Sequence, residues 1–428
     1  MRVSLGRVAC AGTLLLLLAC GAADQPVRVE LPAEAWLEDL DALARELPSR
    51  HVRPFHHVSE EQWRKTVADL GRRIPDLSES EIVVELTRLV ALLGDGHTEL
   101  LPHQSGTGFH RLPLVFREFA DGMRVIAVAP GQERLLGATV QKIGGRSVEQ
   151  LLEAVAPLVA RDNDMELLHS GPEYLATPEV LAYIGAAVSP DEVPLTVSGS
   201  GGDTEDHVVS SIPRTGLGEV RWIRGREQAG GETPLMAKNP AKDYWFERVE
   251  EHGLVFVKYN RCDDQGGEPS IRRFAKLLSK QAAPREFGKL VLDLRHNSGG
   301  DNKKSKPLVD FAVRWKESMP ERQVFILVGR MTFSAAMDAV LQLRRRAAPI
   351  LIGERPRGRP NTVGDVETLR LPNSGLRLDY STRIYDRAPD LASEAYLPLD
   401  VPAPSTWEDY VSGRDPSLEA AIAYGPAG

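Results

Sequence analysis

The sequence predicts an α/β protein in which a helical N-terminal part and a β-rich middle part precede a layer of alternating strands and helices. Three observations predict this arrangement. Apolar residues recur at helical spacing between 31 and 93, and short strand patterns separated by turn residues fill 108–213. From 253 to 354 strand and helix patterns alternate, which is typical of a partly parallel sheet covered by helices.

Length and charge set limits on the function. The chain has 428 residues, of which 42% are hydrophobic and 26% charged, and its net charge is −8. A chain of this length is expected to form two or three domains. The negative charge and the lack of a long basic cluster argue against a nucleic-acid partner.

Residues 1–20 are typical of a lipoprotein export signal. Arg2 and Arg7 precede "AGTLLLLLAC", an apolar stretch too short to span a bilayer. Its last residues, "LLAC", resemble the bacterial lipobox, in which the cysteine becomes a lipidated first residue. We therefore expect an exported protein of the bacterial cell envelope, anchored through Cys20 on the periplasmic or extracellular face of a membrane. Ordinary cleavage near "GAAD", with Cys20 removed or left free, is the alternative.

Residues 21–107 are predicted to form a helical region. In "SESEIVVELTRLVALLG", Ser78 and Glu81 have the spacing of a capping box, and Gly94 is suited to end the helix. "GDGHTELL" follows at once, so His97 is expected on a turn, where small neighbours leave its imidazole accessible. A lone histidine in a turn is either a surface residue or a base.

Residues 108–215 are predicted to form a β-rich module. Its strand patterns are "MRVIAVAP", "GATVQKIGG" and "VPLTVSG", and "SVEQLLEAVAPL" opens with a second capping box, at Ser147 and Gln150. This order of strands and helix resembles a PDZ-type peptide-binding module. The segment "RDNDMELLHSGPEYLATPEV" is then an insertion into that module.

Residues 216–428 are predicted to form the α/β layer, and one of its strand-to-helix corners carries a serine. Ser334 follows the apolar run "QVFILVG" and precedes a helix that begins near Ala335. Unpaired N–H groups at a helix N-terminus stabilise negative charge on such a serine, and the Ala335 N–H can donate to an oxyanion. The alternative is that Ser334 only caps the helix.

A second strand end places paired glycines directly after a buried strand, in "LVLDLRHNSGGD". Gly299 and Gly300 allow backbone N–H groups to approach a ligand closely, as an oxyanion hole requires. The alternative interpretation is a tight polar turn.

Together, "ALLGDGHT", "LDLRHNSGG", "TFSAAM" and "ILIGERPRG" resemble the S41 peptidases, the family of tail-specific and tricorn-type serine proteases. They occur in that family's order and rough spacing, and "HVRPFHHVSEEQW" resembles the N-terminal part of its tricorn-like members. The resemblance implies a ClpP/crotonase-like catalytic domain, a PDZ-like module and a helical N-terminal part. It also implies a serine endopeptidase that acts on peptides or unfolded proteins and needs no cofactor or metal.

The resemblance also assigns roles to individual residues. It implies that Ser334 is the nucleophile and that His97 is the general base. The oxyanion donors are then Ala335 and one of Gly299 or Gly300. Another branch of the family uses a lysine base, where this chain has Arg359. Arginine stays protonated and cannot accept the serine proton, so His97 is the remaining base.

A histidine base needs a third group that fixes its tautomer. Tricorn-like members use a glutamate late in the catalytic domain, and Glu394 in "LASEAYLP" lies in the matching region. Asp95, Glu354 and Asp400 are the competing carboxylates. Tricorn-type members also have a serine directly before the histidine, where this chain has Gly96.

Two further functions stay open at this point. One is a peptide-binding lipoprotein that keeps the fold without catalysis, and the other is a hydrolase of non-peptide acyl compounds on the same scaffold. The histidines of "HVRPFHH" are not expected to bind a metal, because the segment lacks a helical His-x-x-x-His pair and a nearby acidic partner.

Overall fold

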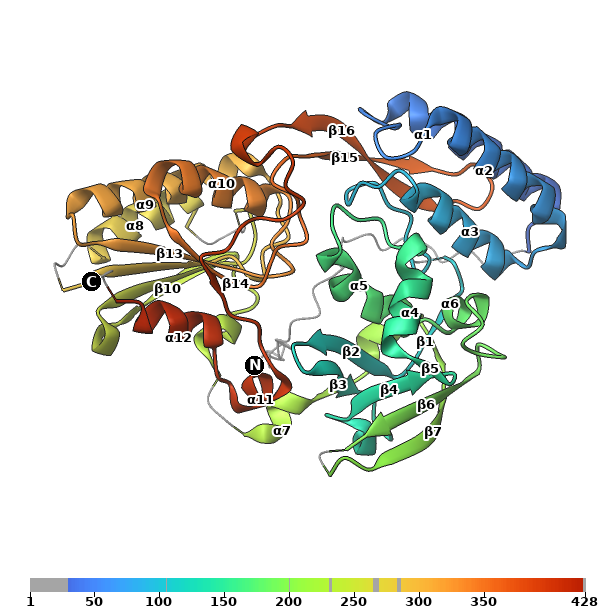
Figure 1. The fold of residues 1–428 in the computed structure, drawn as a ribbon, viewed down its shortest axis with the longest axis horizontal. Helices are drawn as coiled ribbons and strands as arrows, with labels where there is room; N and C mark the ends of the chain where they lie inside the picture. The colour runs from blue at the N-terminus through green and yellow to red at the C-terminus, as the bar shows by residue number, and fades with distance from the viewer. Residues whose placement is uncertain are drawn as a thin grey trace, which may run out of the picture.

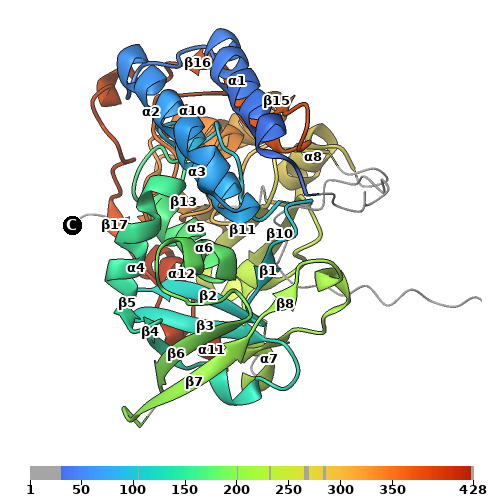
Figure 2. The same cartoon turned by 90° about the vertical axis from the view of Figure 1, so that its right-hand side faces the viewer.

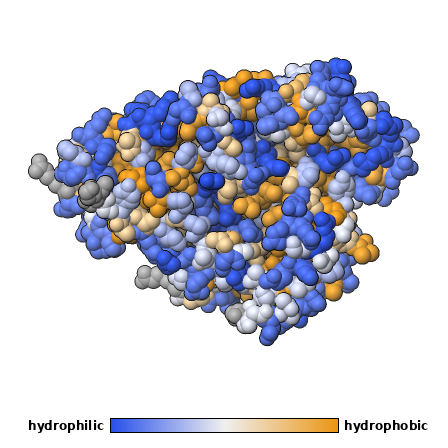
Figure 3. Space-filling view, viewed as in Figure 1, coloured by the Kyte–Doolittle hydropathy of each residue, from blue (hydrophilic) through white to orange (hydrophobic). Residues whose placement is uncertain are grey.

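The computed structural model describes residues 30–104, 106–199, 201–230, 233–264, 269–282 and 286–425. Cys20 and the signal segment lie outside the described residues, so the lipid anchor stays a prediction. Within the described ranges, no helix combines the length and the apolar character needed to cross a membrane. In Figure 3 most of the visible face is hydrophilic, and apolar residues form smaller patches on it.

The N-terminal part is helical, as its periodicity predicts. It consists of α1 (Ala33–Arg50), α2 (Glu60–Arg73) and α3 (Glu79–Ala91). The predicted capping box of α3 is present, because the Ser78 hydroxyl accepts from the Glu81 N–H while the Glu81 carboxylate accepts from the Ser78 N–H. The chain then turns through Asp95 to Thr98, where the Thr98 N–H donates to the Asp95 carbonyl.

The β-rich module is an antiparallel sheet with strand order β2-β3-β4-β6-β7. Its strands are β2 (Leu114–Phe119), β3 (Gly122–Val128), β4 (Thr139–Ile143), β6 (Glu192–Ser198) and β7 (Thr204–Ser210). Between β4 and β6 the chain forms α4 (Val148–Val155), α5 (Met165–Leu175) and α6 (Pro178–Tyr183). The capping box predicted at Ser147 and Gln150 is present at the start of α4. The predicted insertion therefore contains α5 and α6.

The α/β layer is a sheet with strand order β10-β11-β12-β13-β14-β17. Its strands are β10 (Tyr244–Val249), β11 (Leu254–Tyr259), β12 (Lys289–Asp293), β13 (Gln323–Val328), β14 (Ile350–Gly353) and β17 (Val401–Pro402). Only β10 runs antiparallel to its neighbour. Figure 1 shows α8 (Ile271–Gln281), α9 (Lys306–Ser318) and α10 (Ala335–Ala347) on one face, and α12 (Pro416–Ala423) on the other.

A long hairpin connects the α/β layer to the N-terminal helices. It consists of β15 (Thr362–Arg370) and β16 (Arg377–Tyr385), and it follows β14 in the chain. Figures 1 and 2 both place it beside α1. At its tip, the N–H groups of Asn373 and Ser374 donate to the buried carboxylate of Asp39 on α1. The hairpin therefore holds the N-terminal part against the sheet that carries Ser334.

The remaining short elements complete the chain at the edges of these parts. They are β1 (His110–Arg111), β5 (Arg146–Ser147), β8 (Ile212–Pro213), β9 (Ile223–Arg224), α7 (Gly225–Ala229) and α11 (Trp407–Ser412). Because β12 and β13 are parallel neighbours, the segments that follow them meet at the same edge of the sheet. These segments contain the paired glycines and Ser334.

Candidate active site

Ser334 lies at the corner between β13 and α10, where φ is +52° and ψ is −124°. This is left-handed backbone, which a non-glycine residue adopts at a cost of about 1–3 kcal/mol. The side chain makes no capping hydrogen bond to α10, so its hydroxyl does not act as a helix cap. The strained turn leaves the Ser334 hydroxyl at the N-terminus of a helix, and Ser334 lines a pocket there.

The paired glycines pack directly against this corner. Their φ angles are +113° at Gly299 and +127° at Gly300, both in the region that favours glycine. A Cβ atom on Gly299 would lie 2.7 Å from the Ser334 Cβ, and one on Gly300 would lie 2.5 Å from the Cys262 carbonyl oxygen. Both positions therefore require glycine so that the two strand ends can approach each other.

The hydrogen bonds distinguish the two glycines as oxyanion donors. The Gly299 N–H is occupied, because it donates to the Asn297 Oδ1 over 2.9 Å. Within the described ranges, the N–H groups of Gly300 and Ala335 have no hydrogen-bond acceptor. Both of these residues line the pocket with Ser334. The arrangement leaves Gly300 and Ala335 as the pair that can hold an oxyanion.

Asn297 ties the two strand ends together. Its Nδ2 donates to the Tyr259 carbonyl over 3.0 Å, and its own carbonyl accepts from the Phe333 N–H over 3.2 Å. The Thr332 hydroxyl donates to the Leu294 carbonyl over 2.9 Å. These bonds fix the loop after β12 against the residues that precede Ser334.

His97 comes from the N-terminal part and lines the same pocket as Ser334. Its ring stacks on that of Phe333, the residue before Ser334, with centroids 4.2 Å apart and planes 24° apart. The residue is only 8% exposed, and within the described ranges both ring nitrogens are buried without a hydrogen-bond partner. The imidazole is therefore held by packing, and its nitrogens are available to exchange a proton with a neighbouring hydroxyl.

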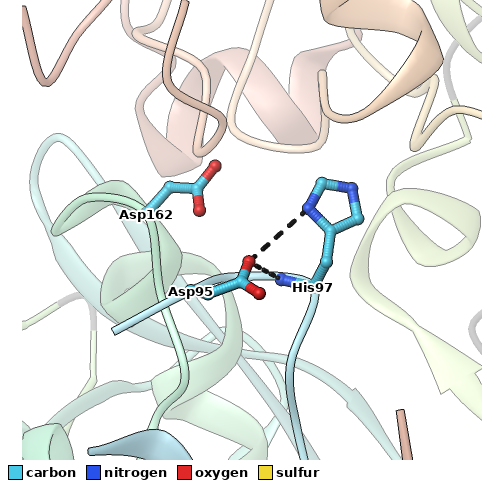
Figure 4. Close-up of side chains that lie close together, drawn as sticks. All are labelled: Asp95, His97 and Asp162. Carbon is cyan, nitrogen blue, oxygen red and sulfur yellow. Dashed lines mark hydrogen bonds and ion pairs between the residues drawn. The ribbon is translucent and has the colours of Figure 1, made fainter. Parts of the chain in front are cut away.

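Asp95 is the carboxylate in contact with the His97 residue (Figure 4). Its Oδ1 accepts the His97 backbone N–H over 2.8 Å and lies 3.9 Å from the Nδ1 of the ring. Its Oδ2 accepts from His51 Nε2 over 3.0 Å and from the hydroxyls of Thr98 and Ser381. Burial acts to raise the pKa of Asp95, but the hydrogen bond from His51 and the nearby His97 outweigh it and lower the pKa below its ordinary value. Asp95 is thus an ionised carboxylate beside the imidazole at neutral pH.

Asp162 is a second carboxylate beside His97, and it comes from the segment before α5 (Figure 4). One ligand atom each of Asp95, His97 and Asp162 lies within 4.8 Å of the others, which is close enough to hold a metal ion. Asp162 accepts from the Gly96 N–H and the Thr362 hydroxyl, each over 2.9 Å. Burial raises its pKa. Because protein donors already occupy the oxygens of both carboxylates, the cluster is better suited to orienting His97 than to binding a cation.

Among the described residues, the other predicted carboxylates make no hydrogen bond or ion pair with His97 and do not line its pocket. Glu394 is exposed and is not among the residues that line the pocket. Glu354 pairs with Arg330 over 2.9 Å, and Asp400 accepts from the Leu351 N–H over 2.8 Å. The family resemblance pointed to Glu394 because it lies late in the catalytic domain, but the chain after β16 leaves that residue at the surface. The position next to the imidazole belongs to Asp95, one of the competing carboxylates.

Two members of the site have no signal in the sequence. Asp162 lies in a polar stretch of the insertion, and only the docking of that insertion on the Gly96 turn brings it to His97. Phe333 is one apolar residue among several, and its contact with His97 joins segments far apart in the chain. Arg359, which stands where another branch of the S41 family has its lysine base, also lines the pocket.

Comparison with known proteins shows the fold. No family model and no curated protein sequence matches the chain. A solved structure of mature CPAF complexed with lactacystin aligns over 91% of this chain and 99% of its own, with a TM-score of 0.61 and 12% identity. Mature CPAF in a second structure aligns over 91% and 96%, with a TM-score of 0.61 and 12% identity.

A weaker likeness is to the photosystem II D1 C-terminal processing protease, which aligns over 92% of this chain and 97% of its own at 15% identity, with a TM-score of 0.38. The chain shares the fold of the CPAF structures, and the predicted α/β class, with a helical N-terminal part, a β-rich module and an α/β layer, is confirmed. At these identities the likeness shows the fold and not the activity.

Proposed function

We propose that this chain is a serine endopeptidase that cleaves peptide or protein substrates through an acyl-enzyme. The observation that carries the proposal is the arrangement around Ser334. Its hydroxyl is free of any capping role, and the pocket that it lines also contains a buried imidazole without hydrogen-bond partners and two backbone N–H groups without acceptors. A nucleophile, a base and an oxyanion hole are the parts that acyl transfer requires.

In the proposed reaction the Ser334 hydroxyl attacks the carbonyl carbon of the scissile bond. His97 accepts the hydroxyl proton and then gives it to the leaving amine, which leaves the acyl group on Ser334. The N–H groups of Gly300 and Ala335 hold the oxyanion of each tetrahedral intermediate. His97 next takes a proton from water, the hydroxide attacks the acyl group, and the proton returns to Ser334 as the acid is released.

Asp95 and Phe333 act as positioning residues for the base. The ionised Asp95 lies on the Nδ1 side of the ring and favours the tautomer that carries its proton there, which leaves Nε2 as the nitrogen that would accept the serine proton. The Phe333 ring fixes the plane of the imidazole by stacking on it. A proton acceptor of this kind contributes about 10²- to 10⁴-fold to the rate.

The place of this activity is also part of the proposal. The signal-like N-terminus supports export, and a lipid on Cys20 would hold the enzyme at a bacterial membrane of the cell envelope. Substrates would then be peptides or unfolded proteins outside the cytoplasm.

A serine-reactive fluorophosphonate probe tests the activity. Mass spectrometry of the labelled protein is expected to find the adduct on Ser334, and Ser334→Ala is expected to abolish labelling and the cleavage of denatured casein. Ser412→Ala removes an exposed hydroxyl of α11 and serves as the matched control, with full labelling. Labelling that persists in Ser334→Ala would show that another residue is the nucleophile.

The substrates offered in the same assay separate the remaining functions. Cleavage of casein or peptides supports the peptidase. Turnover of short esters with no cleavage of any peptide would identify a non-peptide acyl hydrolase, and binding of peptides without labelling or turnover would identify an inactive peptide-binding protein.

A further inference from the structure

Arg359 lies in the pocket beside Ser334 and His97. It lines this pocket together with Gly300, and its backbone N–H donates to Asp162 over 3.3 Å. The same Asp162 carboxylate accepts from the Gly96 N–H, next to His97. The backbone of Arg359 is therefore fixed on the base side of the site, and Arg359 forms part of the pocket wall that a substrate would meet.

The charge of Arg359 is not matched by an acidic side chain. Among the described residues, no carboxylate lies within ion-pair distance of its guanidinium, and its Nε is buried without a hydrogen-bond partner. The neighbouring arginines differ in this respect, because Arg357 pairs with Glu166 over 2.5 Å and Arg387 pairs with Asp338 over 2.7 Å.

The carboxylates of the pocket are themselves engaged. Asp338 holds Arg387, and the Oδ1 of Asp365 accepts from the Tyr385 hydroxyl over 2.5 Å while its Oδ2 lies 3.5 Å from Arg383. Among the described residues that line the pocket, Arg359 is thus the arginine without an acidic partner. Arg359 is half-buried and its Nε is fully buried, so the guanidinium has lost part of its hydration. Hydrogen bonds from its planar fork to a carboxylate would replace the lost contacts with water.

We propose that the Arg359 guanidinium binds a carboxylate of the substrate close to the scissile bond, so that acidic substrates are preferred over their neutral analogues. The inference rests on the proposed function, since it names the substrate class of the same site. The carboxylate is either an acidic side chain or the free C-terminus of a peptide, and both offer the same group to the fork.

Binding to the Ser334→Ala variant tests the inference without turnover. Matched pools of short fluorescent peptides carry Glu or Gln at each position in turn, and each pool is made with a free or an amidated C-terminus. Fluorescence anisotropy is expected to give about 10- to 100-fold tighter binding for the carboxylate member of one of the two pairs. Tighter binding of Glu than of Gln peptides would show that Arg359 binds an acidic side chain. Tighter binding of free than of amidated peptides would show that it binds the C-terminal carboxylate.

Substitutions at Arg359 then decide its role. In the Ser334→Ala background, Arg359→Gln is expected to bring the ratio of carboxylate to amide affinity to about one. Arg359→Lys is expected to keep part of the preference, because it keeps the charge and loses the fork. Arg355→Gln, on the same segment but exposed, is the matched control and is expected to keep the full ratio. Equal affinity for both members of every pair, or a ratio that Arg359→Gln leaves unchanged, would overturn the inference.

The kinetics of the intact enzyme separate this inference from the proposed function. In Arg359→Gln, a KM that rises for acidic peptides and not for neutral ones, in an enzyme that the fluorophosphonate still labels on Ser334, supports a substrate-binding arginine. An equal loss of kcat for acidic and neutral peptides would show that Arg359 stabilises the oxyanion and does not select the substrate. That result would overturn the inference. An unlabelled wild type would refute the proposed function, whatever the binding measurements give.

Discussion

The two halves of the candidate site are built in different ways. The Ser334 corner and the Gly299–Gly300 turn follow two neighbouring parallel strands of one sheet. Hydrogen bonds from the Phe333 N–H to the Asn297 carbonyl and from the Thr332 hydroxyl to the Leu294 carbonyl tie them together. The His97 turn is held instead by contacts from three separate parts. His51 follows α1, Ser381 lies on the hairpin, and Asp162 belongs to the insertion in the β-rich module.

This difference shows what each half depends on. The nucleophile and the oxyanion donors keep their geometry as long as the α/β sheet is folded. The base keeps its geometry only when the N-terminal helices, the insertion and the hairpin are docked together around Asp95. We therefore expect substitutions on the serine side to act on catalysis through local geometry, and substitutions on the histidine side to act through packing and charge.

Among substitutions of the residues that support Ser334 and His97, the largest effect is expected from Gly299→Ala, which breaks the serine side. The added Cβ would lie 2.7 Å from the Ser334 Cβ, at a φ of +113° that alanine adopts only with strain. The corner must move, and the oxyanion donors lose their alignment with Ser334. We expect kcat/KM for peptide cleavage to fall about 10²- to 10³-fold.

Gly288→Ala is the matched control for this change. Gly288 directly precedes β12, and a Cβ added there meets no atom within 4 Å. It is expected to keep its activity within about twofold. Full activity in Gly299→Ala would show that the turn does not pack against the nucleophile.

A smaller effect is expected on the histidine side from Asp95→Asn. The amide carries no charge to stabilise the charged imidazole. Its NH₂ group would also face the donors whose hydrogen bonds the Asp95 carboxylate now accepts. Because the Nδ1 contact is long, at 3.9 Å, we expect kcat to fall about 10- to 100-fold, less than in a tightly bonded triad. The pH profile of kcat reports whether the base has changed.

Glu394→Gln provides the comparison for Asp95→Asn. Glu394 is exposed and is not among the residues that line the pocket, so we expect Glu394→Gln to keep the wild-type kcat. A large loss in Glu394→Gln together with full activity in Asp95→Asn would transfer the role of the orienting acid to Glu394. Circular dichroism of both variants controls for folding.

The smallest effect is a pH-dependent stabilisation by Glu99→Gln. Glu99 follows the His97 turn and bridges to Asp379 of the hairpin through its backbone. Burial, with the charge of Glu166, raises the pKa of Glu99 to about 7. Between pH 4.5, the ordinary pKa of a glutamate, and pH 7, Glu99 keeps its proton in the folded chain and loses it in the unfolded chain. The free energy of unfolding therefore falls as the pH rises from 4.5 to about 7.

Glu99→Gln removes this penalty. Its Tm is expected to equal that of the wild type at pH 4.5 and to exceed it by about 2 to 5 °C at pH 8. The exposed substitution Glu61→Gln on α2 is the control and is expected to change Tm at neither pH. A gain that is the same at both pH values would show that ionisation of Glu99 is not its cause.

The sequence predicts the serine side better than the histidine side. Ser334, the glycine pair and the strands before them are local patterns, and the capping boxes of α3 and α4 are confirmed. The choice of Gly300 over Gly299 depends on one hydrogen bond from the Gly299 N–H to Asn297, which no pattern specifies. Asp162, Phe333 and the hairpin act through docking of distant segments, so no local signal identifies them. Glu394 follows from family spacing, and spacing does not determine which side chain is buried.

The rate at which a fluorophosphonate labels Ser334 in His97→Gln tests the central claim most directly. If the His97 imidazole activates the Ser334 hydroxyl, the second-order rate in His97→Gln is expected to lie about 10²- to 10⁴-fold below that of the wild type, with unchanged circular dichroism. The exposed control His252→Gln is expected to keep the wild-type rate. A rate for His97→Gln equal to that of the wild type would contradict the account.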